Sequence, residues 1–92
     1  MKLTDAVERN EAHPDTFEIP NTESRTSVPF GHYVKIGFDN RERMWVKVTE
    51  KHGDLYVGTL TNDPVVVNLN FGDRVEFTER NIMDICPPRN DR

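Results

Sequence analysis

The sequence has a single cysteine, no run of hydrophobic residues long enough to cross a membrane, and no cluster of basic residues. A lone Cys86 cannot form an intrachain disulfide, and it suits a reducing compartment. A membrane-spanning helix needs ~20 consecutive apolar residues, which no stretch approaches. The N-terminal residues are too acidic and too poor in apolar side chains for a signal peptide. We therefore expect a cytoplasmic protein that does not associate with membranes.

The charges are divided unevenly along the chain. Residues 1–24 hold two basic and six acidic side chains, whereas residues 25–92 hold ten of each kind. A protein that binds nucleic acid usually neutralises several phosphates with clustered Lys and Arg. The absence of such a cluster disfavours a nucleic-acid partner.

The residue spacings of common catalytic and metal sites are missing as well. The soft metal ligands are His13, His32, His52 and Cys86. None of them stands at a paired zinc-binding spacing, and no nucleophile elbow or phosphate-binding glycine loop occurs. Asp63 and Asp73 sit in turn sequences, where short polar side chains bond to nearby backbone. We expect no catalytic residue, metal or cofactor, and a small enzyme using a carboxylate or Cys86 stands only as a second alternative.

Alternation of apolar and polar residues is the main positive signal, and it begins at residue 31. Five segments read as strands separated by turn residues: 32–38, 43–49, 55–60, 65–69 (VVVNL) and 74–79. Asp39 and Asn40 mark one of the turns. The segment 81–85 is apolar enough for a helical turn or a closing strand. Five short, regularly spaced strands favour a small sandwich or barrel over a βαβ fold.

The first thirty residues differ from the rest. Asp5 followed by Glu8 resembles a helix-capping box, and His13-Pro14 must end the short helix that it starts. We predict a mainly β protein: a small five-stranded antiparallel SH3-like, partly open barrel preceded by a short N-terminal helix. Residues 1–30 form an acidic segment of short helix plus loop packed on the barrel, 31–85 the barrel, and 86–92 a loose tail.

Four sequence segments, in the same order along the chain, resemble those of a known family: HYVKIGF, ERMWVKV, GTLTNDP and FGDRVEFTERNIMDI. The chain is similar, from about residue 6 to residue 85, to the bacterial family called domain of unknown function 2314. That family has no established activity to transfer. The resemblance implies a bacterial protein, and it suggests a role as an immunity or regulatory partner protein.

The polar face of the predicted sheet offers the best candidate site. Alternation places Tyr33, Trp45 and Tyr56 on three successive strands of this face, interleaved with Lys35 and Lys47. If the face is exposed, these aromatic side chains would anchor a protein partner. The first alternative is that they bind single-stranded nucleic acid by stacking on its bases. The other interpretation is that the N-terminal segment covers the face, with Leu3, Val7, Phe17, Ile19 or Phe30 on Trp45.

Aromatic residues and Arg supply most interface energy, and rigid turns present polar contacts. The predicted binding residues are therefore Trp45, Tyr33, Tyr56, Arg43, Asn62 and Asp63. They predict a non-enzymatic protein-interaction module, either a monomer or a homodimer paired through an edge strand such as VVVNL.

Overall fold

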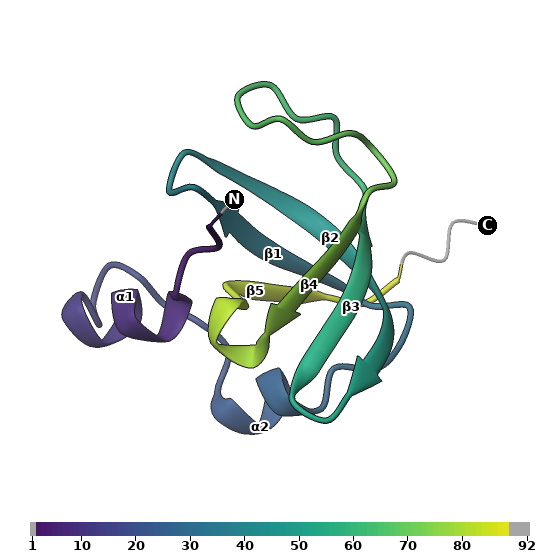
Figure 1. Cartoon of the computed structure of the whole chain (residues 1–92). Coiled ribbons are helices and arrows are strands. Elements are labelled where there is room, and N and C mark those ends of the chain that lie inside the picture. The colour runs from purple at the N-terminus through teal and green to yellow at the C-terminus, as the bar shows by residue number, and fades with distance from the viewer. Residues whose placement is uncertain (1, 89–92) are drawn as a thin grey trace.

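The computed structural model describes residues 2–88 and contains one curved antiparallel sheet (Figure 1). Its elements in chain order are α1 (Ala6–Ala12), α2 (Thr22–Thr26), β1 (Tyr33–Phe38), β2 (Glu42–His52), β3 (Leu55–Leu60), β4 (Arg74–Thr78), the 3₁₀ helix η1 (Glu79–Asn81) and β5 (Asp84–Cys86). No helix among residues 2–88 is long and apolar enough to cross a membrane.

The strands follow the order β4-β3-β2-β1-β5, so the chain meanders from β1 to β4 and then returns to β1. The long strand β2 pairs with β1 through its first half and with β3 through its second half, which lets the sheet curl. The turn η1 connects the two edge strands, β4 and β5, which do not pair with each other. The predicted fold class, a mainly β protein with a small five-stranded, partly open barrel and a short N-terminal helix, is confirmed.

The Asp39-Asn40 turn between β1 and β2 also forms as predicted. Both residues have positive φ, at 55° and 54°. Two consecutive left-handed residues match the twist of the flanking strands, and Asn and Asp tolerate this conformation better than other side chains. The turn fixes the pairing of Tyr33 with Lys47 and of Lys35 with Trp45.

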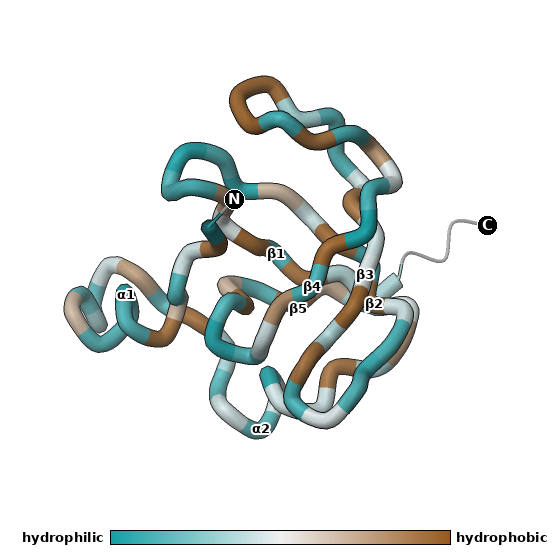
Figure 2. Tube along the Cα trace, in the orientation of Figure 1, coloured by the Kyte–Doolittle hydropathy of each residue, from teal (hydrophilic) through white to brown (hydrophobic). Residues whose placement is uncertain are grey.

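The core lies on the concave side of the sheet. Its largest buried side chains include Phe38, Ile36, Tyr56, Phe77 and Leu60. Tyr56 and Phe77 are cross-strand partners whose rings stack at a centroid distance of 5.3 Å. Hydrophobic positions recur along β1 to β4 in Figure 2, which is the alternation visible in the sequence.

The predicted fourth strand, VVVNL, is not a strand. Residues 61–73 form a long loop that extends beyond the sheet beside the β1–β2 hairpin (Figure 1). The Glu42 carboxylate accepts the backbone N–H groups of Val65, Val66 and Val67 at 2.8, 2.9 and 3.1 Å. These amides are therefore not available to a sheet ladder, and β3 pairs directly with β4 instead.

The fifth strand is β5, at the segment for which the sequence left a helical turn or a closing strand open. It pairs with β1 and ends at Cys86, one residue beyond the predicted end of the barrel. An edge-paired homodimer would consequently have to use β4 or β5. Residues 89–92 of the predicted tail lie outside the described residues.

Helix α1 begins as the sequence predicts. The Asp5 side chain accepts the Glu8 backbone N–H at 2.9 Å, and His13 follows the last helical residue. The residues before the helix run along the far end of β1, where Thr4 N–H donates to the Gly37 carbonyl at 2.9 Å. A Cβ at Gly37 would approach Thr4 Oγ1 and Met83 Cε to 2.6 Å, so glycine permits this close contact.

Helix α2 was not predicted, since 20–29 reads as a polar loop. Its N-cap is Asn21, whose side chain accepts the Ser24 N–H at 2.8 Å. The buried Arg25 at its end donates to Glu79 Oε1 of η1 at 2.8 Å and to the Pro20 carbonyl. Helix α2 is therefore held to the connection between the two edge strands.

Candidate functional site

The outer face of the β1–β2 hairpin carries a square of four side chains. Tyr33 lies opposite Lys47, and Lys35 lies opposite Trp45. The aromatics occupy one diagonal of the square and the lysines occupy the other. Lys35 Nζ lies 5.3 Å from the centre of the Trp45 ring, a cation–π distance.

A hollow of about 810 Å³ opens beside this square. Tyr33, Trp45 and Lys47 line it from the sheet, Asn62 from the β3–β4 loop, and Pro87 and Pro88 from the segment after β5. We call it the Tyr33–Trp45 hollow. Both aromatic side chains are half-buried in its wall, and Lys47 is exposed.

Backbone contacts hold the rim of the hollow in place. The Trp45 backbone N–H donates to Asn62 Oδ1 at 2.5 Å, and the Trp45 carbonyl accepts the Thr61 N–H and hydroxyl at 3.0 and 2.9 Å. The first residues of the β3–β4 loop are thereby joined to β2. Asn62 is fixed next to Trp45, as an interface contact would require.

Tyr56 does not belong to this site, and its predicted place on the exposed face is wrong. Its side chain is fully buried on the core side, together with Gly58 and Leu60 of the same strand. The hydroxyl donates to the Arg25 carbonyl at 2.8 Å and accepts the Val28 N–H at 3.1 Å. These partners come from the N-terminal segment, so the phenol lies between the sheet and that segment.

The remaining two predicted residues lie outside the hollow. Arg43 is exposed, and its guanidinium lies 5.6 Å from the ring of Phe17 in the N-terminal segment. Arg9 of α1 approaches the same ring at 5.5 Å. Asp63 is exposed in the β3–β4 loop and does not line the hollow. The structure thus brings together Tyr33, Trp45 and Asn62, with Lys47 as a fourth member.

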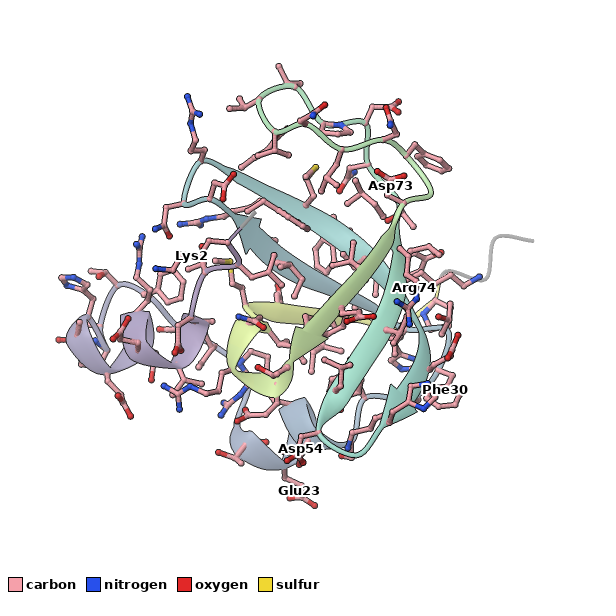
Figure 3. All side chains as sticks on the ribbon, viewed as in Figure 1. Lys2, Glu23, Phe30, Asp54, Asp73 and Arg74 are labelled. Carbon is pink, nitrogen blue, oxygen red and sulfur yellow. The ribbon has the colours of Figure 1, made fainter. Side chains whose placement is uncertain are left out.

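The N-terminal segment covers one end of the outer face. Phe17 and Ile19 border a groove of about 780 Å³ whose sheet side includes Lys35 and Arg43. Tyr33 and Trp45 do not line this groove. Phe30 was one of the residues expected to pack on Trp45 if the N-terminal segment covered this face. It is 63% exposed and lies at the surface in Figure 3.

Three members of the hollow gave no signal in the sequence. Thr61, Pro87 and Pro88 sit next to Trp45 and Tyr33 only because the β3–β4 loop and the end of β5 meet there. Such contacts between distant segments depend on sheet order and register, which single-sequence patterns do not supply. The turn sequence at Asn62 was a usable signal, because turn residues with fixed geometry often carry contacts.

The Glu42 carboxylate is the other unusual polar group of this region. Its hydrogen bonds from the Val65 and Val66 N–H groups, with a smaller contribution from Val67, lower the pKa of Glu42 below its ordinary value. The loop that it holds exposes Val65 and Val66. Among residues 2–88, no group of three His, Cys, Asp or Glu side chains is placed to bind a metal ion.

Comparison with known proteins gives no match to a family model, to a curated protein or to a solved structure. The resemblance to domain of unknown function 2314 therefore stays a hypothesis, and the site rests on its geometry.

Proposed function

We propose that the protein is a non-enzymatic interaction module that binds another protein through the Tyr33–Trp45 hollow. The observation that carries this proposal is the pair of half-buried aromatic rings that face an open hollow instead of the core. Tryptophan and tyrosine have large apolar surfaces with a polar edge, and both are enriched among the residues that dominate binding energy.

The setting of the two rings supports binding. They stand on a two-stranded ladder of fixed register, and Asn62 is tied to the Trp45 backbone. A site on rigid elements loses little conformational entropy when a partner docks. The aromatic surface is therefore prepared for contact without rearrangement.

The same face is less well suited to binding nucleic acid than to binding a protein. Arg43 lies against Phe17 and Lys35 over Trp45, so Lys47 is the only lysine or arginine of residues 2–88 that lines the hollow. Binding of single strands combines stacking with a groove of several cations along the backbone. A protein partner needs no such groove.

The biological setting is also part of the proposal. The family resemblance favours a bacterial immunity or regulatory partner protein, and the single cysteine favours the cytoplasm. We expect a monomer or a homodimer paired at a sheet edge.

Site-specific photo-crosslinking in bacterial cells tests this proposal. A benzophenone amino acid at Tyr33 is expected to give a covalent adduct with one partner, identified by mass spectrometry. The matched control carries the same group at Glu23, which is exposed on α2 and points away from the sheet in Figure 3. Trp45→Ala should remove the Tyr33 adduct.

Lys47→Glu provides a second variant in case Trp45→Ala lowers the thermal stability, because Lys47 is exposed and its replacement leaves the core intact. An adduct that persists in both variants, or that forms equally from Glu23, would show that the partner docks elsewhere.

A further inference from the structure

Several side chains that line the Tyr33–Trp45 hollow carry hydrogen-bond donors. Lys47 has an ammonium group, Asn62 a side-chain amide and Trp45 an indole N–H, whereas the hydroxyls of Tyr33 and Thr61 can donate or accept. The Asn62 oxygen is already occupied by the Trp45 backbone N–H, so the amide nitrogen is the part of that side chain left for a ligand. No aspartate or glutamate of residues 2–88 lines this hollow.

Lys47 has no internal partner among the described residues. Ion pairs in this part of the chain join Arg25 to Glu79, His52 to Glu50, Arg74 to Glu76 and Arg80 to Asp5. The acidic side chains of residues 2–88 therefore leave Lys47 without an ion pair, although the whole chain has a net charge of −4. A cation that lines a hollow together with two aromatic rings favours a ligand of negative charge.

The lining of the hollow includes two consecutive prolines of the chain itself. Pro87 and Pro88 follow β5 and border the same hollow as Tyr33 and Trp45. Proline-containing extended segments suit aromatic surfaces because their backbone is already restricted before binding. An extended peptide can therefore lie against these rings at low entropic cost.

We propose that the hollow binds an extended peptide segment of the partner in which a carboxylate side chain neighbours an aromatic or proline residue. The carboxylate pairs with Lys47 and accepts from the Asn62 amide, and the apolar neighbour covers Trp45 and Tyr33. This inference rests on the proposed function, and it adds the chemistry of the segment that the partner presents.

The test uses the full chain labelled with ¹⁵N and two acetylated, amidated hexapeptides. One has the sequence Gly-Pro-Glu-Tyr-Pro-Gly, and the other carries Gln in place of Glu. The first peptide should shift the Trp45 indole and Asn62 side-chain amide signals in a saturable way. The Gln peptide should bind about two- to fivefold more weakly, which corresponds to the loss of one exposed ion pair.

Two charge-matched variants locate the effect. Lys47→Gln should lose the preference for the Glu peptide, whereas Lys2→Gln should keep it. Lys2 lies beside the far end of β1, and Figure 3 shows it on the opposite side of the molecule from Phe30. Gly31, which follows Phe30, lines the hollow. Both lysines are exposed, so neither replacement threatens the fold.

Equal affinity for the two peptides, or no shift at Trp45 with either, would overturn the proposal. Stronger binding of a short oligothymidylate at the same signals would replace the peptide with nucleic acid. Should crosslinking from Tyr33 still depend on Trp45 while the two peptides bind equally, the interaction site stands and only the carboxylate preference fails.

Discussion

Tyr56 links three parts of the molecule through one side chain. Its ring stacks on Phe77 of β4, and its hydroxyl bonds to backbone groups of Arg25 and Val28 before β1. The Tyr56 hydroxyl thus provides a hydrogen-bond partner for two buried backbone groups, the carbonyl of Arg25 and the N–H of Val28. A hydroxyl used in this way is structural, so Tyr56 is not available to a partner.

Tyr56→Phe is expected to destabilise the protein by about 1–3 kcal/mol, because the two buried backbone groups lose their partner while the stacked ring remains. Urea unfolding followed by fluorescence measures the change. Tyr33→Phe is the control, since Tyr33 is half-buried and its hydroxyl bonds to no other described residue, and it should change stability by less than about 0.5 kcal/mol. Equal effects of the two variants would refute the structural role of the Tyr56 hydroxyl.

At the scale of elements, strand β3 shows why alternation misassigned Tyr56. Five of its six positions are apolar or small, and Tyr56, Val57 and Gly58 are all buried, so neither face reads as polar. The register decides the matter, because Val46 pairs with Leu60 and Val48 with Gly58. A bulge at Thr49 then reverses the alternation of β2 and brings Lys51 opposite Tyr56. Neither the register nor the bulge has a sequence signature here.

Local chemistry was predictable where a few neighbouring residues determine the structure. The Asp5 cap, the Asp39-Asn40 turn and the strands β1 and β2 all follow from side-chain types within a short window. The same reasoning selected Tyr33, Trp45 and Asn62 as candidate binding residues, and the structure places these three around one hollow. It failed at VVVNL, since β propensity describes how well side chains fit a sheet and not whether a distant carboxylate takes the backbone amides.

The β3–β4 loop should respond to pH through Glu42. Hydrogen bonds from the Val65, Val66 and Val67 amides lower the pKa of Glu42 in the folded chain, so the contacts are present above the ordinary pKa of 4.5 and are lost as pH falls through the lowered value. Amide NMR shifts of these three residues should titrate together with a midpoint below 4.5. A midpoint at or above that value, or independent titrations, would refute the role of the Glu42 carboxylate in holding this loop.

Glu42→Gln should loosen the loop at neutral pH, because a neutral amide accepts hydrogen bonds more weakly than a carboxylate. Faster hydrogen exchange at Val65–Val67 is the expected result. Glu50→Gln is the matched control, since Glu50 is exposed on the other half of β2 and pairs with His52. Exchange rates that stay unchanged in Glu42→Gln would place the restraint on the loop elsewhere.

The whole molecule depends on its first thirty residues more than the sequence indicates. Ala6 and Val28 are buried, and residues 2–4 run beside the end of β1. Arg25 holds α2 to η1 through Glu79, and Asp5 pairs with Arg80 of the same turn. The N-terminal segment therefore closes the side of the open barrel where the connection between its two edge strands runs.

A chain that begins at residue 31 is consequently expected not to fold on its own. It would expose Tyr56 with two lost hydrogen-bond partners and would lose the buried side chains of Ala6, Arg25 and Val28. A small domain has few other contacts to offset such a loss, because it buries a modest share of its surface. Circular dichroism during thermal melting should show a cooperative transition for the full chain and none for 31–92. Adding a synthetic peptide of residues 1–30 should restore the transition in a concentration-dependent way.

A cooperative melt of 31–92 alone, at the midpoint of the full chain, would mean that the barrel is complete without the segment and that the contacts of Arg25 and Val28 contribute little to its stability.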